Sequence, residues 1–592
     1  MSEGRIIIGN SSYSNIKLQV EDEEFKDISV DLKKFHIFHN DIVNVVDGRI
    51  TAISEEISKY RSELLPGILE ITGIKKYGFT KRGTPIYLWR PFDKRVPCFY
   101  VSSNIRKDVS HRYSNVYCII RYDSWDRDKP TGTQIRILGS VHDDRATSLY
   151  LQYCYGLYNK RYRFPKDLTI PKIDDFLGDI PYDDSYIFSI DPKGTLDIDD
   201  AFSIKCFDNI YEIGIYIADP TTIIDILQNK YGCDSLLKDI YKRGFTVYNL
   251  YENSPMMPTE LSNGLVSLLP GHKRLSLSVH LRFKKNGIML PEIGIKHNVI
   301  KNNRAYSYTE VDDIVKTDKT KRDVYKLYEL SQLIAEKNTP VLYNTEWDSH
   351  KMVETMMVLA NMRVAQLLYN ISTDKLITRS HKGFNNRISS ISDTISQKIR
   401  ILNTQAAKYT TSHSKHVGLG VNLYTHYTSP IRRIVDLYTH YLIKEVIFDI
   451  KIPKEIEGLP DDLDRVNQMV KMSKRYELTM DKLKIYNFIR EEFDGIDTVE
   501  GVIVGMRDNY LRIFIEKYNI VLEHHIIHPD ISHLYIYTLC YDNLGNIYRQ
   551  QVESDNSLEK IQVYELYKSY KITLYTIKAD RIRDRIRFDF ED

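Results

Sequence analysis

The segment YIFSIDPKGTLDIDDAFSI, residues 186–204, gathers acidic side chains between two apolar stretches. Within ten residues it carries Asp191, Asp197, Asp199 and Asp200. Carboxylates crowded into a small volume repel one another unless cations neutralise them, and Mg²⁺ or Mn²⁺ are hard ions that favour oxygen ligands. Two such ions about 3.5–4 Å apart suit phosphodiester hydrolysis, since one activates water and the other stabilises the leaving oxygen. We therefore interpret the segment as a candidate metal site.

Two alternatives exist for this acidic segment, namely a solvated turn and a structural calcium loop. The pattern of an EF-hand does not fit well, because the glycine and the terminal glutamate that its loop requires are missing at their places. A solvated turn is not usually held between two apolar strands, and YIFSI and AFSI look like buried strand ends. The catalytic metal site is the hypothesis that fits both observations.

The segment LYTHYTSPIRRIVDLYTHYLIKEV, residues 423–446, predicts a helix that begins near two arginines. Ser429 suits an N-cap and Pro430 the first helical position. Arg432 and Arg433 would then lie in the first turn, where the helix dipole attracts anions and disfavours cations. A phosphate at this place would explain them, whereas a surface pair bonded to nearby carboxylates is equally compatible. The expected buried stripe of this helix consists of Ile431, Val435, Tyr438 and Leu442.

A second helix is predicted over residues 351–370, and it is apolar almost all round. Glu354 and Asn361 are seven residues apart, so they share one of its faces. Buried polar groups need partners. These partners are either other side chains of a core hydrogen-bond network or the sugar of a nucleotide, and the sequence alone favours the core network.

Composition restricts the function classes before any fold is considered. The chain has 592 residues, of which 42% are hydrophobic and 27% charged, so we expect a globular protein of roughly four domains. The formal net charge is 82 − 80 = +2, which does not indicate a nucleic-acid-binding protein. The six cysteines form no CxxC pair, so neither a zinc site nor a disulfide framework is expected.

Neither a signal peptide nor an apolar run of about 18 residues is evident, so we expect no membrane partner and a cytoplasmic protein. The nucleus and a virion remain open as compartments.

The order of strand-like and helical stretches predicts four domains. Short strand-like runs cut by Gly, Asn and Asp indicate two small β-barrels, at residues 1–66 and 67–150. A mixed block with long helical stretches at 352–369 and 463–491 follows over 170–492, and short strands return over 496–592.

Basic and aromatic residues alternate in the second expected barrel. This is the composition of a surface that binds single-stranded nucleic acid, although an ordinary charged β-surface would look the same. The residues are Lys75, Lys76, Tyr77, Phe79, Lys81, Arg82, Tyr87, Trp89 and Arg90.

Together these segments resemble the ribonuclease II family, the RNB-type exoribonucleases. The matching segments follow the family's order: DPKGTLDIDDAFSI, IYIADPTTII, FTVYNLYENSPMMPTELS, SLLPGHKRLSLSV, AYSYTEV, MVETMMVLAN and HVGLGVNLYTHYTSPIRRIVDLYTH. The chain is more similar to the eukaryotic exosome-nuclease and type-2-like branch, without its N-terminal endonuclease domain. The resemblance implies a multidomain α+β protein in which two cold-shock barrels and a C-terminal barrel, all OB-folds, flank a large mixed α/β RNB domain.

The resemblance also implies hydrolytic 3′→5′ degradation of single-stranded RNA to nucleoside 5′-monophosphates. By motif position, Asp191, Asp197, Asp199 and Asp200 would bind Mg²⁺, with Mn²⁺ a possible substitute, and Asp199 is most tied to catalysis. Arg432 is similar to the arginine that steadies the scissile phosphate, with Arg433 beside it. Tyr308 and Glu354 look like the residues that hold the 3′-terminal nucleotide. Tyr248 is similar to the aromatic on which a base stacks. No organic cofactor is implied, and we expect a monomer.

A few positions depart from the family's pattern. Thr195, Tyr427 and Ile434 replace usual alanine, phenylalanine and tyrosine, and TRSHKGFN at 378–385 loses a proline. The second aromatic of the family's base clamp cannot be assigned. The competing hypothesis is a catalytically inactive RNA-binding regulator on the same scaffold, although all four acids are retained here. A deoxyribonuclease is a third and weaker alternative.

Overall fold

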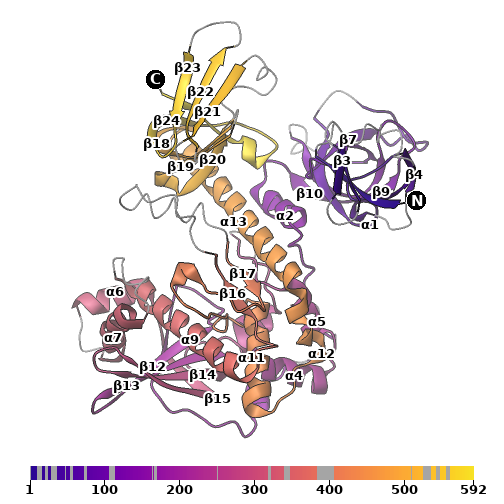
Figure 1. Ribbon diagram of the computed structural model, residues 1–592. Helices are drawn as coiled ribbons and strands as arrows, with labels where there is room; N and C mark the ends of the chain where they lie inside the picture. The colour runs from indigo at the N-terminus through magenta and orange to yellow at the C-terminus, as the bar shows by residue number, and fades with distance from the viewer. Residues whose placement is uncertain are drawn as a thin grey trace. The chain divides into compact units, whose positions relative to one another are not determined.

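The computed structural model of the chain forms two compact units, Met1–Tyr158 with Met472–Asp592, and Asn159–Lys471 (Figure 1). Each unit is described by itself. The described residues are 2–9, 16–20, 24–27, 36–46, 49–53, 58–72, 76–105, 114–162, 164–165, 168, 170–249, 251, 253–317, 322–338, 347–382, 406–507, 510–524, 535–541, 547–554 and 560–591.

A closed five-stranded β-barrel forms the centre of the Asn159–Lys471 unit. Its strands pair in sequence order and antiparallel, except that the first and last close the barrel in parallel. The sequence analysis expected a mixed α/β block here and did not predict a barrel. The strands are β11 Ile187–Asp191, β12 Asp200–Phe207, β13 Ile210–Ala218, β14 Lys273–Lys284 and β15 Met289–Ser307.

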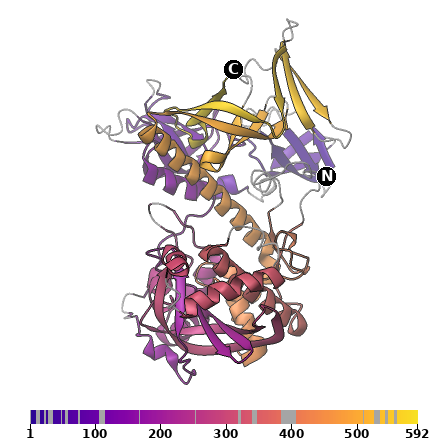
Figure 2. The same ribbon diagram turned by 90° about the vertical axis from the view of Figure 1, so that its left-hand side faces the viewer.

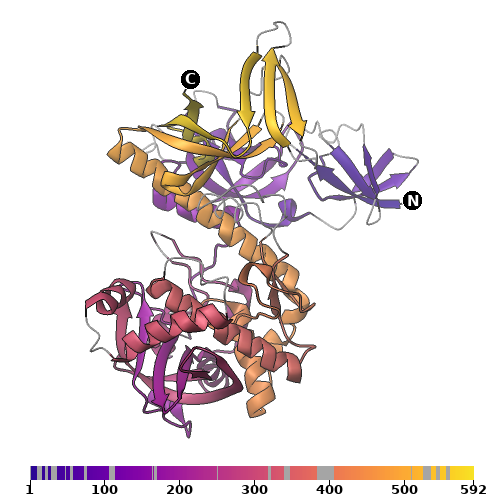
Figure 3. The same cartoon turned by 60° about the vertical axis from the view of Figure 1, so that its left-hand side comes forward.

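Helices and short strands complete this unit. Figures 2 and 3 show α9, Ser349–Ile371, alongside the barrel. Its buried residues belong to the same apolar core as the barrel strands, as expected for a helix that is apolar almost all round. The other elements are α3 Asp174–Leu177, α4 Pro220–Tyr231, α5 Leu236–Arg243, α6 Tyr308–Thr317, α7 Arg322–Asn338, α11 Ile434–Phe448, α12 Lys454–Glu457, β16 Thr378–Ser380 and β17 Lys408–Thr410. The long helix α13, Leu463–Glu492, begins in this unit and ends in the other.

The Met1–Tyr158 and Met472–Asp592 unit contains one closed barrel in its described part, of strand order β10-β8-β7-β6-β9. Its strands are β6 Leu65–Glu70, β7 Ile86–Pro91, β8 Phe99–Ser102, β9 Val116–Ser124 and β10 Thr131–Ser140, and α1 Lys59–Ser62 and α2 Asp144–Cys154 flank them. The expected boundary between residues 66 and 67 falls inside β6. The four domain limits therefore stay predictions.

The strands before β6 form a five-stranded sheet of order β3-β2-β1-β4-β5 rather than a closed barrel, as far as the described residues reach. Its apolar side chains join those of the closed barrel in one core. Three OB-fold barrels were predicted, and this sheet differs from that expectation in being open. The strands are β1 Ser2–Ile8, β2 Ile16–Val20, β3 Glu24–Asp27, β4 Ile42–Val46 and β5 Arg49–Ile53.

The C-terminal strands also form open sheets in the described residues, one of order β20-β19-β18-β24-β25 and one of order β21-β22-β23. The long strand β18 pairs antiparallel with β19 on one edge and with β24 on the other, so it joins the two halves of the first sheet. The strands are β18 Ile496–Arg507, β19 Tyr510–Ile515, β20 Ile520–His524, β21 Tyr535–Tyr541, β22 Ile547–Ser554, β23 Lys560–Glu565, β24 Ser569–Thr576 and β25 Ile586–Phe590.

The basic and aromatic stretch of the second barrel divides between its core and its surface. Tyr87 and Trp89 are buried on β7, and the indole N–H of Trp89 donates to the Cys118 carbonyl at 3.1 Å. Phe79 is 60% exposed with the Lys76 ammonium over its ring. Strand alternation on β7 sends Tyr87 and Trp89 inward, so these two rings are not available to a ligand, whereas Phe79, Lys81 and Arg82 are exposed on the segment before β7. A binding role of this exposed segment stays a prediction. Lys75 lies outside the described residues.

No helix in the described part of the chain combines the length and apolarity needed to cross a bilayer.

A buried ion pair ties α11 to the start of α4. The Lys444 ammonium lies 2.7 Å from Asp219 Oδ2, and both side chains are almost completely buried. His297 Nε2 and the hydroxyls of Thr221 and Thr222 also hydrogen-bond to this carboxylate. Burial alone would raise the pKa of Asp219, but Lys444 and His297 hold it well below its usual range. The pair therefore fixes the helix that follows the two candidate arginines.

We predict that Lys444→Met destabilises the chain by about 3–5 kcal/mol at pH 7, because it leaves a buried carboxylate without its cation. Chemical denaturation followed by circular dichroism would measure this, and the Asp219→Asn/Lys444→Met double variant should recover part of the loss. Since the pKa of Asp219 is depressed by folding, its contribution to stability persists at neutral pH and is lost as the pH falls below about 4. A loss below about 1 kcal/mol would contradict the prediction.

Candidate active site

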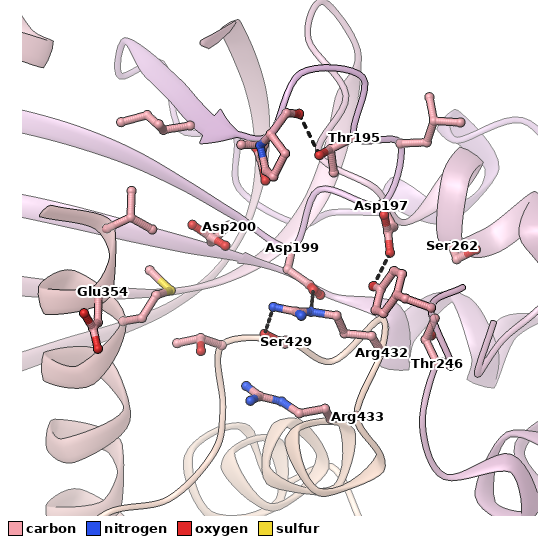
Figure 4. A pocket seen from close by; sticks show the side chains of 18 of the residues that line it. Thr195, Asp197, Asp199, Asp200, Thr246, Ser262, Glu354, Ser429, Arg432 and Arg433 are labelled. Atoms are coloured by element: carbon pink, nitrogen blue, oxygen red, sulfur yellow. Dashed lines mark hydrogen bonds and ion pairs between the residues drawn. The ribbon is translucent and has the colours of Figure 1, made fainter. Parts of the chain in front are cut away.

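One pocket of about 830 Å³ in the Asn159–Lys471 unit brings together all nine residues that the sequence singled out for chemistry. Figure 4 shows part of its lining, with Asp199 and Arg432 near its centre. Among the lining residues are Asp191, Asp197, Asp199, Asp200, Tyr248, Tyr308, Glu354, Arg432 and Arg433. Residues separated by more than 200 positions in sequence thus meet at one place.

The end of the barrel positions the acidic residues. Strand β11 ends at Asp191 and its neighbour β12 begins at Asp200, so the loop between them carries the other two acids at the same edge. The parallel register of β11 and β15 sets Asp191 opposite Ser307, and Tyr308 follows directly as the first residue of α6. The Ala218 N–H donates to the Asp199 carbonyl at 2.8 Å and fixes the loop end to β13.

Asp199 is held by the segment that leads into α11. Its Oδ1 accepts the Ile431 backbone N–H at 3.0 Å and its Oδ2 accepts Arg432 Nε at 3.0 Å. Asp199 is only 4% exposed, whereas the Arg432 side chain is 44% exposed. Burial raises the pKa of Asp199 to about 7 even though Arg432 opposes the shift. Arg432 therefore pairs with a buried carboxylate while much of its guanidinium remains open to the pocket.

The predicted start of the arginine helix is wrong by several residues. Helix α11 begins at Ile434, and Arg433 occupies its N-cap position with extended backbone angles, φ −136° and ψ 126°. The reason is strand-like pairing: the Thr246 N–H donates to the Arg432 carbonyl at 3.1 Å, and the Ile434 N–H to the Gly244 carbonyl at 2.8 Å. Arg432 and Arg433 therefore lie in a turn before the helix rather than in its first turn.

Ser429 acts in that turn instead of capping the helix. Its hydroxyl accepts a hydrogen bond from an Arg432 terminal nitrogen at 3.1 Å, as Figure 4 shows. The Arg433 guanidinium pairs with Asp436 in the first turn of α11 at 2.7 Å, which is the carboxylate-bonded alternative. The helix is buried all round from Ile434 to Lys444, not only along the predicted stripe.

Asp191 and Asp200 each carry a carboxylate oxygen, Oδ2, that is buried and has no hydrogen-bond partner. Burial raises the pKa of Asp191 to about 6, and it raises that of Asp200 well above its usual range, with repulsion from Asp191 and Asp199 adding to the effect. Unpartnered buried oxygens are unfavourable unless something binds them. A hard divalent cation is a ligand that would satisfy both.

Asp197 and Asp199 each have a carboxylate oxygen that accepts a hydrogen bond from another side chain. The Tyr248 hydroxyl donates to Asp197 Oδ2 at 2.6 Å, and Arg432 holds Asp199. Accordingly, within the described ranges no set of three or more Asp, Glu, His or Cys side chains is arranged around one point as metal ligands. Tyr248 is 40% exposed, so its ring faces the pocket while its hydroxyl is bonded to the acidic loop.

The two polar residues of α9 have different surroundings. Asn361 is buried, where its amide donates to the Tyr424 hydroxyl at 3.0 Å and its Oδ1 accepts the Tyr427 backbone N–H at 2.8 Å. It therefore belongs to a core hydrogen-bond network. The Glu354 side chain is 43% exposed, pairs with Lys351 at 2.6 Å and lines the pocket. Both residues line the pocket, but only the Glu354 side chain is substantially exposed.

His350 is a pocket neighbour that the sequence analysis missed. Its ring stacks on Tyr308, with ring centroids 3.7 Å apart and planes at 10°. It lies in the first turn of α9, and Ser349 beside it donates to the Tyr308 carbonyl at 3.1 Å. No spacing signal could have revealed the pair, because it depends on how α6 and α9 pack. Further polar lining residues were also missed: Lys193, Thr246, Asn253, Ser262 and Asn263.

We predict that Asp191→Asn stabilises the chain by on the order of 1 kcal/mol or more at pH 8 in EDTA. The pKa of Asp191 is raised by folding, so ionising it above about pH 6 opposes folding when no cation is bound. The gain should shrink as the pH falls from 6 toward 4 and vanish below about pH 3, where the carboxyl is protonated in both the folded and the unfolded state. Thermal melts across this range would measure it.

Asp184→Asn is the matched control for this measurement, because Asp184 is exposed. The control should change the melting temperature little at any pH. Equal melting temperatures of the wild type and Asp191→Asn at pH 8 would contradict the prediction.

Comparison with known families identifies two regions of the chain. The RNB domain matches residues 180–449, and the Dis3-like cold-shock domain 2 (CSD2) matches residues 86–151. The first region contains all nine residues of the pocket named above. The second contains most of the closed barrel of the other unit.

Curated relatives are similar at low identity. The probable exosome complex exonuclease RRP44 of Caenorhabditis elegans is 22% identical over 533 residues, which covers 74% of this chain and 53% of the relative. Ribonuclease R 1 of Lactococcus lactis is 26% identical over 419 residues, covering 59% and 50%. DIS3-like exonuclease 2 of Schizosaccharomyces pombe is 23% identical over 663 residues, covering 90% and 68%. The chain spans about half the length of the first two relatives.

Two solved structures share the fold. Mycoplasma genitalium RNase R in complex with ribose methylated single-stranded RNA covers 100% of both chains with a TM-score of 0.74 and 16% identity. Yeast Ssd1, described as a pseudonuclease, covers 88% of this chain and 78% of its own with a TM-score of 0.63 and 16% identity.

Proposed function

The chain belongs to the RNB family, and from this premise we propose that it is a hydrolytic 3′→5′ exoribonuclease acting on single-stranded RNA. Its products would be nucleoside 5′-monophosphates. One observation carries the proposal: the four acids of the 191–200 segment and Arg432 line the same pocket, and Asp199 and Arg432 form an ion pair there. The names of the relatives as exonucleases and as ribonuclease R support the same reaction.

Two unpartnered carboxylate oxygens of this pocket suit a divalent metal. Asp191 and Asp200 offer unpartnered buried oxygens, and Asp197 and Asp199 lie on the same short loop. We propose that these four residues hold Mg²⁺, with Mn²⁺ a possible substitute. When bound, the metal would activate water and stabilise the leaving oxygen. Its binding would also favour the ionised form of carboxyls whose pKa values are otherwise raised by burial.

Arg432 is proposed to steady the scissile phosphate. Its Nε is committed to Asp199, but a planar guanidinium has further N–H donors that can bind a phosphate. Ser429 accepts a hydrogen bond from one terminal nitrogen and so fixes the plane of the group. Arg433 is paired with Asp436 at a distance of 2.7 Å, which suits an electrostatic contribution better than direct contact.

The remaining pocket residues suit the end of a single strand. Tyr248 presents a partly exposed ring for base stacking, and Tyr308 and Glu354 are proposed to hold the 3′-terminal nucleotide and its sugar. Stacking tolerates every base, so sequence preference should be weak. A carboxylate can accept a hydrogen bond from a 2′-hydroxyl, which would favour RNA over DNA.

A second candidate function is an RNA-binding protein without catalysis. The observation that favours it is the shared fold with yeast Ssd1, which is described as a pseudonuclease. Retention of all four acids in one pocket supports the enzyme instead. RNA binding that is unchanged by EDTA, with no monophosphate released, would identify this alternative.

We predict that the chain shortens a 5′-labelled single-stranded RNA stepwise in Mg²⁺, and that Asp199→Asn lowers the rate about 100-fold or more. This variant loses a carboxylate oxygen that would bind the metal, and it removes the anionic partner of Arg432. Chromatography of the released nucleotides should find 5′-monophosphates, and EDTA should abolish their release. Asp184→Asn is the control and should degrade RNA at the wild-type rate.

The direction of degradation is tested by blocking one end of the RNA at a time. An RNA blocked at its 3′ end should resist, whereas blocking the 5′ end should have no effect. Full-length label in every reaction, under varied salt and metal, would overturn the enzyme assignment.

We predict that His350→Ala lowers kcat/KM about threefold to tenfold, because Tyr308 loses the ring on which it stacks. His350→Phe should restore most of the activity, since a phenyl ring can take the same position. The melting temperatures of all three proteins should be similar. His350 would be a positioning residue, and an alanine variant with wild-type kinetics would exclude that role.

A further inference from the structure

A second pocket, of about 260 Å³, lies in the Met1–Tyr158 and Met472–Asp592 unit. Most of its lining comes from β7 with the turn that follows it, helix α2 with the residue after it, and the segment 580–583 between β24 and β25. Ile68, Tyr117 and Thr479 complete it. Hydrogen bonds tie the 580–583 segment to the barrel side, because Asn115 donates to Asp580 at 2.8 Å and the Arg585 guanidinium donates to the Val141 carbonyl. The pocket shares no residue with the candidate active site.

One wall of this pocket is aromatic. Phe92 lies in T-shaped contact with Tyr150 and Tyr155, with ring centroids 6.1 and 5.6 Å apart. Phe92 is 39% exposed, while Tyr150 is held by stacking on the buried Tyr117 at 4.0 Å. A partly open ring supported by packed rings is a rigid surface on which another flat ring can lie.

The other wall is cationic. Arg90, Lys94, Arg581 and Arg583 line the pocket against one carboxylate, Asp580. Arg90 is paired with Glu70 and lies 3.9 Å from Asp580, and Arg583 lies 3.6 Å from Asp584, which leaves Lys94 and Arg581 less compensated. Neither Lys94 nor Arg581 makes a side-chain hydrogen bond or ion pair within the described residues. Burial and repulsion from Arg583 lower the pKa of both groups, although the nearby Asp584 carboxylate opposes the shift.

We propose that this pocket binds a nucleotide, with the base against Phe92 and the phosphate on Lys94, Arg581 and Arg583. An inorganic anion would leave the aromatic wall unused, and an apolar ligand would leave the cations unpaired. The volume is below the roughly 300–1,000 Å³ of pockets for drug-sized ligands, which suits one base rather than an extended strand. The nucleotide is either a free nucleoside 5′-monophosphate or one residue of an RNA strand. The site requires no catalysis and is independent of the proposed function.

Photo-crosslinking of the full chain tests this site directly. The probe is 8-azidoadenosine 5′-monophosphate, and mass spectrometry of the digested protein locates the label. We expect label on peptides that contain Phe92 or Tyr155, in addition to label in the active-site pocket. The Lys94→Ala/Arg581→Ala variant should reduce label at the second pocket about tenfold or more, because charge-assisted contacts to phosphate are lost. Phe92→Ala should reduce it several-fold.

Two controls keep the result specific. Arg587→Ala removes an exposed cation of β25 that does not line the pocket, and it should leave the labelling unchanged. Label at the active-site pocket should be equal in all variants, which shows that each one is folded. The readout requires no hydrolysis, so it is separate from the outcome of the RNA degradation assay.

The source of the nucleotide is decided by a second probe, a 5′-phosphorylated oligoribonucleotide carrying 5-iodouridine, used with the Asp199→Asn chain in EDTA. Crosslinks at Phe92 or Tyr155 from this probe alone would support an RNA residue, and crosslinks from the azido monophosphate alone would support a free nucleotide. Equal labelling by 8-azidoadenosine without phosphate would overturn the proposal. So would an absence of label at this pocket from both probes, or label that the variants do not reduce.

Discussion

The ion pair between Asp199 and Arg432 is the contact on which the rest of the site depends. It joins the acidic loop at the end of the barrel to the turn that precedes α11, two segments more than 200 residues apart in sequence. The pair buries a carboxylate beside other carboxylates, which is unfavourable for folding in isolation. Natural proteins retain such arrangements where function requires them, and the site is consistent with this rule.

The surrounding fold offsets that unfavourable arrangement with contacts that have no catalytic part. The buried pair of Lys444 and Asp219 fixes α11 to α4, and the strand-like pairing of residues 244–246 with 432–434 fixes the turn. The same pairing leads directly to Tyr248, so the aromatic that faces the pocket and the arginine at its centre are positioned by one backbone contact. Rigid neighbours are what a site needs to hold its groups in place.

The acidic segment, the two arginines and the long helices could be predicted from the sequence because each of these signals is local, whereas Tyr248 and Tyr308 were assigned only through the family resemblance. Four acids between two apolar stretches, and an apolar helix carrying Glu354, are visible in a short window. The barrel of β11 to β15 was missed because its closure depends on pairing between distant strands. The start of α11 was misplaced because a tertiary hydrogen bond from Ile434 to Gly244 outweighed the capping preference of Ser429. The stacking of His350 on Tyr308 likewise arises only from helix packing.

We propose that the carboxylates of the 191–200 segment hold divalent ions beside an arginine that binds phosphate. The most direct measurement is anomalous diffraction from crystals soaked in Mn²⁺, with and without a short RNA. We predict anomalous density between Asp191 and Asp200, and a phosphate of the RNA within hydrogen-bond distance of Arg432. Absence of density between these oxygens at saturating Mn²⁺, together with an Arg432 that makes no contact with the RNA, would contradict the account.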